Sequence, residues 1–393
     1  MAIKIYRSTD AGAPSLTGQA GSMVTVLDAV LVNGYNTVSI SSITRVGATA
    51  TVVCAAAHGL AKGDSALIAG AAQTDYNIDA VVTVVDPTTF TYTVANSPTT
   101  PATGTITVKR APAGFTKVYA GTNKAAYRAN DLTSNRMYLC CDDTGGSTGG
   151  GGEARMYGYE TMTSVDAGTN PFPTAAQSAN GYFWRKSSTT DATARAWWII
   201  TDGKLVYYFN QYDLAAAKLM TGPTFSGAFG DFLSYKAGDA YSTILTGCSA
   251  AGATSSSALN GLFNAMQSIT NGSSFSSSTV VPRDYTGVPG ARYVGLLGSG
   301  LGSPFGGTTY ISYPHLIDSG YYLSPALITQ TTPALVRGRI PGMYEGWHGR
   351  TFNHGDIIDN VQGLPGRALM HLYGQSILGN GCILLDITGP WDA

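Results

Sequence analysis

Histidine and aspartate residues near position 350 are the first candidates for chemistry. His348 and His354 flank Arg350, and Asp356 and Asp359 follow closely. Zinc accepts imidazole and carboxylate ligands. The spacing H-x5-H followed by two aspartates, however, matches no metal-ligand motif for which there is a structural reason. We expect a structural loop whose polar groups are hydrogen-bonded, and a metal site is the alternative.

A second set of carboxylates could serve glycoside hydrolysis. The adjacent Asp142 and Asp143, together with Asp191 and Asp202 on neighbouring predicted hairpins, could supply a pair of carboxyl groups around a glycosidic bond. The reaction depends on the distance between the two groups, which the sequence does not set. No arrangement of nucleophile, base and orienting group is visible, so we expect no catalytic residue, no metal and no cofactor.

Two glycine-rich segments invite a nucleotide-binding interpretation that their spacing does not support. The run at 144–152 leads into Glu153 and a strand pattern, whereas a P-loop needs Gly-Lys-Ser/Thr at the start of a helix. The run at 295–302 has glycines at 298, 300 and 302, which differs from the G-x-G-x-x-G spacing of a dinucleotide site. We expect a hairpin tip and a glycine-rich turn.

Aromatic pairs mark the clearest hairpin, in which residues 194–200 and 204–209 flank a turn at Asp202-Gly203. Neighbours on a strand point to opposite faces, so the core must cover one face and something else the other. That second cover could be another subunit, or the rings could stack on sugars. The candidate interaction surface consists of Trp197, Trp198, Tyr207, Tyr208, Trp347 and Trp391.

Residues 42–110 form the only long segment whose sequence pattern predicts a folding unit that needs no other part of the chain. Turn residues separate β-like runs at 50–54, 81–85, 89–94 and 104–108. They predict a small β-barrel with neighbouring ends, as in a domain inserted into another. The expected organisation is an N-terminal strand and helix of the main domain (1–41), the inserted barrel (42–110) and the remainder of the β-rich main domain (111–393).

The rest of the chain predicts β-sandwich or β-barrel modules with two or three short helices. Apolar residues at helical spacing mark helices near 23–31 and 259–269; Ser22 is the expected N-cap of the first, and Asn33-Gly34 its end. Strand patterns occur at 136–141, 154–159, 335–340, 367–373 and 382–388. We also expect Trp391 to be packed.

Composition and charge favour contacts with other proteins. Only 12% of the 393 residues are charged, about half the usual share, and the chain has 49 glycines and 23 tyrosines. Tyrosine gives contact area and a hydroxyl group for a partner. A net charge of −1 without a basic cluster argues against nucleic-acid binding.

Targeting signals and cysteine usage suggest a protein folded in the cytosol. The first residues lack the apolar core of a signal peptide. The sequence also contains no run of 18 apolar residues, so we expect no membrane insertion. The five cysteines have no metal-ligand spacing, so we expect reduced and mostly buried thiols.

Several motifs carry a resemblance to phage proteins. The barrel segment resembles a module of tailed-bacteriophage structural proteins that is similar to the first catalytic cysteine half-domain of ubiquitin-activating enzymes, without their chemistry. Its motifs are His58-Gly-Leu-Ala-Lys-Gly-Asp64, Thr89-Phe-Thr-Tyr92 and Thr99-Thr-Pro-Ala-Thr-Gly104. Over most of its length the chain resembles virion proteins of phages of Gram-negative hosts, on the segments 1–10, 171–173, 230–239 and 386–391.

The resemblance implies a virion protein assembled in the host cytoplasm, and two classes of function compete. The first is a non-enzymatic structural component of the tail, baseplate or fibre-attachment region, bound to other virion proteins and repeated in a ring or trimer. A capsid decoration or collar protein is an alternative within this class. The second class is a protein that binds a host-surface polysaccharide, or a depolymerase that cleaves it.

Overall fold

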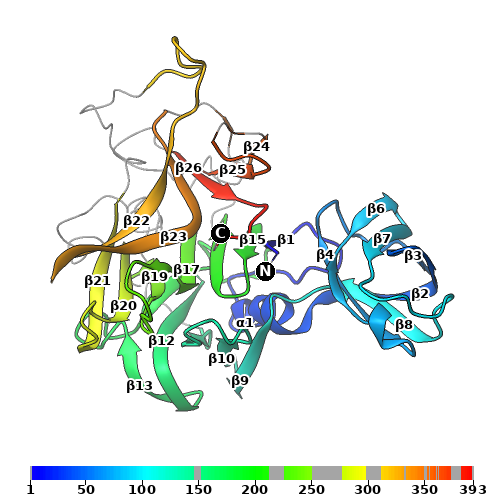
Figure 1. Cartoon of the computed structure of the whole chain (residues 1–393). Helices are drawn as coiled ribbons and strands as arrows, with labels where there is room; N and C mark the ends of the chain where they lie inside the picture. Colours follow the sequence, from blue (N-terminus) through cyan, green and yellow to red (C-terminus); the bar gives the residue numbers. More distant parts are fainter. Residues whose placement is uncertain are drawn as a thin grey trace.

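Layers of antiparallel strands stack around two large hydrophobic clusters in the main part of the chain (Figure 1). The computed structural model describes residues 2–145, 152–211, 225–249, 277–297, 311–331, 333–348, 352–353, 355–359, 361, 363–372 and 382–391. The fold is mainly β with short helical segments, as the sequence predicts. The helix predicted at 259–269 lies outside the described residues.

The strands of the main part fall into three groups. The first layer contains β9 (Phe115–Gly121), β10 (Lys124–Ala129), β11 (Tyr138–Asp142), β12 (Glu153–Ser164), β13 (Ala167–Phe172) and β14 (Tyr182–Arg185). The central layer contains β1 (Lys4–Arg7), β15 (Trp197–Thr201), β16 (Leu205–Asn210), β17 (Phe225–Asp231), β19 (Thr243–Cys248), β20 (Ser277–Arg283) and β21 (Pro289–Leu297). The last layer contains β18 (Leu233–Ser234), β22 (Leu323–Thr331), β23 (Ala334–Gly346), β24 (Ile357–Asp359), β25 (Ala368–Leu372) and β26 (Cys382–Asp386).

The central layer is buried on both faces. Trp197 and Tyr208 face a cluster shared with the first layer, whereas Tyr207 faces a cluster shared with β23, β25 and β26. In Figure 1, β10 and β12 lie below the central strands, and β25 and β26 lie above them. Side chains alternate along a strand, so each adjacent aromatic pair contributes to both clusters. The second cover that the hairpin requires is therefore part of the same chain, and no other subunit is needed for it.

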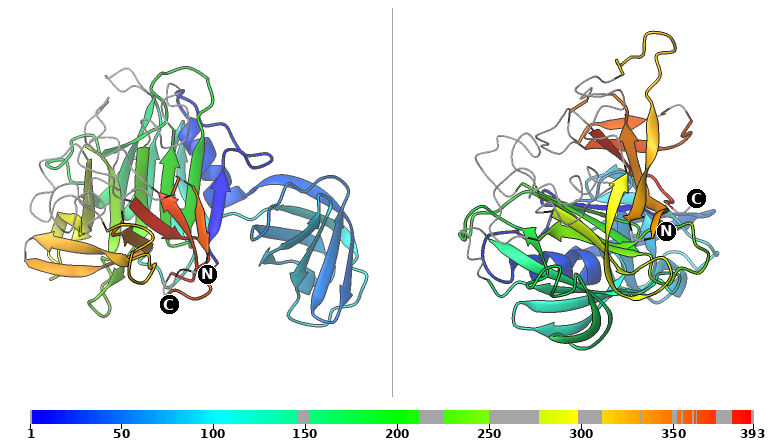
Figure 2. Two further views of the ribbon diagram at one scale, coloured as in Figure 1. Left: turned by 90° about the horizontal axis from the view of Figure 1, so that it is seen from above. Right: turned by 90° about the vertical axis from the view of Figure 1, so that its left-hand side faces the viewer.

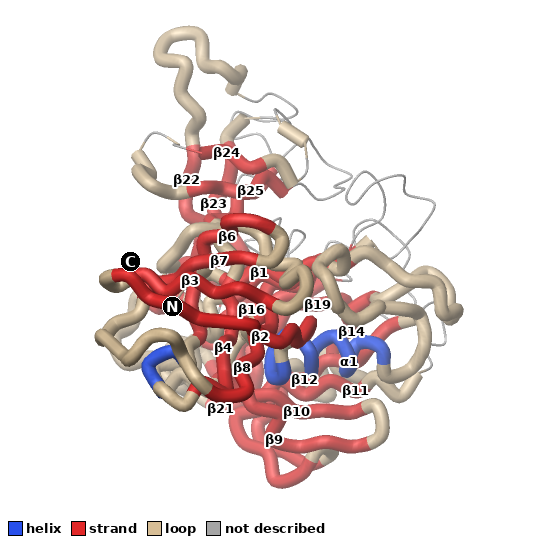
Figure 3. The backbone as a smooth tube through the Cα atoms, turned by 90° about the vertical axis from the view of Figure 1, so that its right-hand side faces the viewer, coloured by secondary structure: helices blue, strands red, loops and turns tan. Residues whose placement is uncertain are grey.

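The first predicted helix is present, with a different N-terminus. Helix α1 (Ser22–Leu27) continues as a π-helical segment (Asp28–Asn33) that ends at Gly34, and its apolar face packs in the first cluster. Figure 3 shows the helical segment in blue among the strands of the first layer, and its π-helical part contacts β9. Ser22, the predicted N-cap, is the first helical residue, and Gly21 precedes it. Asp143 instead accepts the N–H of Met23 through Oδ2 at 2.8 Å, so a distant loop supplies the cap.

Residues 35–110 form a nearly closed barrel with a cluster of its own. The strands are β2 (Tyr35–Val46), β3 (Thr49–Cys54), β4 (Ser65–Ala71), β5 (Asp79–Val81), β6 (Thr83–Asp86), β7 (Thr89–Thr93) and β8 (Gly104–Arg110), and a 3-10 turn lies at Thr74–Tyr76. Pairing runs β5-β4-β8-β2-β3-β7-β6. Only Val82 separates the edge strands β5 and β6, so the sheet closes where the chain bends at Val82. The sequence predicts one strand at 81–85, and the structure breaks it at this bend.

The barrel meets the main part through a buried polar junction. Arg110, at the end of β8, forms ion pairs with Asp64 and Asp10 and donates to the backbone oxygen of Ile5. Tyr35, at the start of β2, donates its hydroxyl to Asp10 Oδ2 at 2.8 Å. Because β2 starts at Tyr35, the barrel begins before the boundary predicted at residue 42.

The His-Gly-Leu motif of the barrel has a structural role. His58 Nδ1 accepts the N–H of Leu60 at 3.0 Å, and its Nε2 donates to the backbone oxygen of Asp86 at 3.0 Å. Asp64 Oδ2 accepts the N–H of Ala61 at 2.8 Å and pairs with Arg110. His58 and Asp64 thus hold loops in place.

Excising the barrel is expected to leave the main part folded. Tyr35 pairs with Arg110, so a short Gly/Ser linker that joins Asn36 to Lys109 can replace residues 37–108. Arg110 keeps Asp10 as its partner in this variant. We expect cooperative thermal unfolding and an intact near-ultraviolet circular dichroism spectrum, compared with those of the full chain. Collapse of the remaining chain would show that the barrel is no separable insertion.

No helix among the described residues is long and apolar enough to cross a membrane. Four cysteines, Cys54, Cys140, Cys141 and Cys248, are buried free thiols, as expected for those positions. Burial raises the pKa of Cys54 to about 11 and that of Cys140 to about 12. The Cys54 and Cys140 thiols are consequently protonated, and they act as small apolar side chains in the clusters.

Candidate functional site

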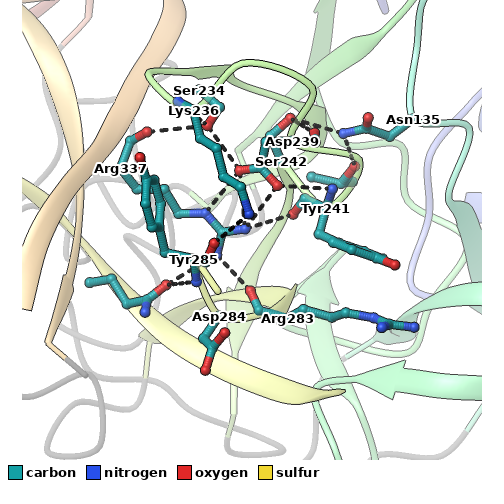
Figure 4. A network of polar contacts seen from close by, with 12 residues as sticks. Asn135, Ser234, Lys236, Asp239, Tyr241, Ser242, Arg283, Asp284, Tyr285 and Arg337 are labelled. Carbon is teal, nitrogen blue, oxygen red and sulfur yellow. Dashed lines mark hydrogen bonds and ion pairs between the residues drawn. The ribbon is translucent and has the colours of Figure 1, made fainter. Parts of the chain in front are cut away.

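A cavity of about 500 Å³ with a mixed polar and apolar lining lies where the β15–β16 turn meets the end of β17. Its walls come from four segments: the turn at 202–204, the stretch 231–242, residues 133–135 and Pro341. Figure 4 shows the polar network beside it. The volume falls within the range of about 300–1,000 Å³ typical of small-molecule sites.

Asp202 closes the β15–β16 turn and also lines the cavity. Its Oδ1 accepts the backbone N–H groups of Lys204 at 2.8 Å and Leu205 at 2.7 Å. Its Oδ2 has no hydrogen-bond partner among the residues that the structure describes, although the residue is only 6% exposed. Burial raises the pKa of this carboxyl above its ordinary value, and the two N–H groups partly offset the effect.

Asp231 supplies a second carboxyl group to the cavity from the end of β17. Its Oδ2 accepts the backbone N–H of Asn135 and its Oδ1 accepts the Thr243 hydroxyl, both at 2.7 Å. Burial raises the pKa of Asp231, and the nearby charge of Asp202 adds to the shift. The backbone N–H of Asp231 also donates to Lys204 O at 3.2 Å, so the turn and the strand end are joined directly.

A buried arginine supports the wall of the cavity that contains Asp239 (Figure 4). Arg337 contacts the Asp239 carboxylate at 3.3 Å and donates to Gln330 Oε1 at 3.1 Å and to the backbone oxygen of Arg283 at 2.6 Å. Lys236 lies over the Tyr285 ring and donates to the Tyr285 backbone oxygen at 2.7 Å. The stretch 231–242 is therefore anchored to β20, β22 and β23.

The carboxylates predicted for glycoside hydrolysis are not brought together. Asp143 is fully buried against Lys186, and Asp142 pairs with Lys124. Asp191 accepts hydrogen bonds from Thr189 and Thr193 before β15, whereas Asp202 follows the other end of that strand. Of these four residues, only Asp202 lines the cavity, and its neighbouring carboxyl group is Asp231.

Most of the predicted aromatic surface is buried. Trp197, Tyr207, Tyr208 and Trp391 are at most 4% exposed and lie in the two clusters, so their rings present no face to a partner. The prediction of an interaction surface is corrected at these four positions, because the chain itself covers both faces of the central layer. Trp391 donates its ring N–H to Asp386 O at 2.8 Å, which confirms that it is packed.

The other two aromatic candidates, Trp198 and Trp347, are half-buried. Trp198 packs at the margin of the second cluster. Trp347 donates its ring N–H to Ser324 Oγ at 3.1 Å. These two side chains are not part of the cavity lining. For Trp198 and Trp347, the interaction surface stays a prediction.

His348 binds backbone groups. Its Nε2 accepts the N–H of Tyr322 at 2.7 Å, and its Nδ1 lies 3.1 Å from the backbone oxygens of Ile311 and Ser312, as a donor. Burial lowers the pKa of this imidazole, in keeping with a neutral ring. His354 and Arg350 lie outside the described residues. Among the described residues, no group of three His, Cys, Asp or Glu side chains is arranged to hold a metal ion.

Sequence reasoning missed most of the cavity. Asn135, Asp231 and Lys236 come from segments that pair only in the folded chain. One signal was present, because the polar stretch 230–239 is among the segments that carry the resemblance to virion proteins, and it supplies a large share of the wall.

Comparisons with known proteins give little guidance. No family model matches the chain, and no curated protein matches its sequence. Among solved structures, the chain is similar to the endosialidase of phage phi92, with 10% identity and a TM-score of 0.18, over 83% of this chain and 72% of that chain. A similarity at this level supports no argument about fold or activity. The resemblance of the barrel to the half-domain of ubiquitin-activating enzymes stays a prediction.

Proposed function

We propose that this protein is a non-enzymatic structural component of a tailed-phage virion. Its place is the tail, baseplate or fibre-attachment region, where copies contact one another and other virion proteins in a symmetric assembly. The motifs of residues 58–64 and 230–239 support the virion assignment by resemblance. The barrel supports a role in assembly.

The observation that carries the proposal is a separately packed barrel with apolar residues on its outside. The barrel projects from the side of the main part, as Figure 1 and the left view of Figure 2 show. Val46 is 85% exposed, Val85 is 61% exposed, and Val53 and Val81 are also exposed. A separately packed module that projects from the main part can reach a neighbouring subunit, and its exposed valines would add apolar contact area there. We infer that the barrel docks on a neighbouring subunit.

The structural roles of the potentially reactive side chains support the non-enzymatic part of the proposal. Asp143 neutralises Lys186 and caps α1, and Asp64 pairs with Arg110. His58 and His348 hold backbone groups. Each of these residues stabilises the fold, which is a sufficient reason for its presence.

Virion composition tests the proposal. Particles washed at high salt should contain the chain in a fixed, small-integer ratio to the other tail proteins, as measured by quantitative mass spectrometry, because a symmetric ring sets its copy number. Immunogold labelling should place it on the tail; labelling of the capsid or collar would favour those alternatives. The isolated chain should release no fragments from host lipopolysaccharide. Absence from washed particles, or turnover of the polysaccharide, would contradict the proposal.

A further inference from the structure

We propose that the cavity between the β15–β16 turn and the stretch 231–242 binds a neutral, hydroxyl-rich saccharide. The residues that carry the inference are Asp202, Asn135, Asp231, Lys204 and Lys236. This binding function goes beyond the assembly role and does not rest on it. A failure to bind sugar would leave the virion proposal unchanged.

The charges around the cavity are balanced, which favours a neutral ligand. Asp202 and Asp231 share the lining with Lys204 and Lys236, while the third lining carboxylate, Asp239, is neutralised by Arg337 behind the wall. An anion such as a phosphate would meet the carboxyl groups, and a cation would meet the ammonium groups. Sugar hydroxyl groups can donate to the carboxyl oxygens and accept from the ammonium groups at the same time.

An available acceptor points to a ligand that donates hydrogen bonds. Asp202 is 6% exposed, its Oδ1 is occupied by the turn, and its Oδ2 has no partner in the part of the chain that the structure describes. This oxygen borders the cavity and can accept a hydrogen bond from a hydroxyl group that a ligand brings there. Asn135 uses its side-chain nitrogen on Ser242 Oγ at 3.0 Å, which leaves its amide oxygen as a second acceptor.

The cavity also offers apolar surface and fixed geometry. Phe232, Leu233 and Pro341 contribute to its lining, and such surface suits the C–H faces of a pyranose ring. The Asp202 carboxyl is held by two backbone N–H groups, and the Asp231 carboxyl by Asn135 and Thr243. Groups fixed in this way lose little conformational entropy when a ligand binds.

The test uses the full chain and simple sugars as probes. Methyl α-glucopyranoside, methyl α-galactopyranoside and N-acetylglucosamine are titrated in saturation-transfer NMR, beside the charged analogues glucosamine and glucuronate. We expect saturation transfer to at least one neutral probe and weaker transfer to the charged analogues. Absence of transfer to all the neutral probes, or stronger transfer to a charged analogue, would overturn the proposal.

Asp202→Asn is the decisive variant, because asparagine keeps the Oδ1 acceptor of the turn and replaces Oδ2 with a donor. We expect affinity for the bound probe to fall about tenfold or more, with a similar unfolding midpoint. The matched control is Asp86→Asn, since Asp86 Oδ1 likewise accepts a backbone N–H, that of Thr88 at 2.7 Å, in the barrel. Unchanged affinity in Asp202→Asn, or an equal loss in Asp86→Asn, would refute the assignment.

A second variant covers the case in which Asp202→Asn fails to fold. Thr133 is exposed at the rim of the cavity, so Thr133→Trp fills space without disturbing the clusters. We expect this variant to fold and to lose saturation transfer to the bound probe. Full retention of transfer would place the sugar elsewhere and overturn the proposal.

Discussion

Asp143→Ala is expected to lower the free energy of unfolding by about 3–5 kcal/mol, because it leaves the Lys186 ammonium buried without its partner. The side chains of Lys186 and Asp143 are 1% and 0% exposed, and Nζ and Oδ1 lie 2.5 Å apart. The change also removes the acceptor for the Met23 N–H at the start of α1. Chemical denaturation followed by tryptophan fluorescence measures the loss.

A surface pair of the same chemistry provides the control. Lys124 and Asp166 lie 2.7 Å apart, but Asp166 is 66% exposed. Water screens this pair, so Asp166→Ala should cost less than about 1 kcal/mol. Similar losses in both variants would show that burial is not the reason for the effect at Asp143.

We expect the loss of folding stability in the partner variant Lys186→Met to depend on pH. Burial raises the pKa of the Asp143 carboxyl, and Lys186 opposes that shift. Without the ammonium group, the pKa in the folded state lies further above that in the unfolded chain, so the folded state binds the proton more tightly. The free energy of unfolding that Lys186→Met loses, relative to the unchanged protein, should therefore be smaller at about pH 5 than at about pH 8. A deficit that grows toward acid would contradict this reasoning.

The hairpin shows what local pattern can and cannot predict. Two apolar runs around Asp202-Gly203 predict β15 and β16, and the structure confirms them. The same runs indicate that both faces are covered, but they do not identify the covering element. The cover comes from β23, β25 and β26, far along the chain, and any apolar strand would satisfy the pattern equally well.

Long-range pairing also explains the other differences. Ser22 has the residue type of an N-cap, yet Asp143 supplies the acceptor, from more than a hundred positions away. β2 was not predicted over 35–46, because its weak alternation becomes a strand only between β3 and β8. The cavity follows the same rule: Asp202 was a candidate, but Asp231 becomes its neighbour only when β16 pairs with β17.

Arg337→Met is expected to lower the free energy of unfolding by about 3–5 kcal/mol and to disturb the wall of the cavity. Arg337 is fully buried on β23 and holds groups from three other segments. Removing the guanidinium leaves the Asp239 carboxylate and the Gln330 amide oxygen without this donor. Because Asp239 also accepts the hydroxyl of Ser234, the loss should spread to the stretch 231–242.

Hydrogen exchange and a conservative variant separate a local from a global effect. In Arg337→Met, amides of the stretch 231–242 should exchange faster than those of β15 and β16. Arg337→Lys restores the charge but not the planar set of donors, so it should recover only part of the stability. Arg339→Met, two residues along the same strand and half-buried, is the control and should cost much less. Full recovery by lysine would mean that charge alone, without the guanidinium geometry, holds this wall of the cavity in place.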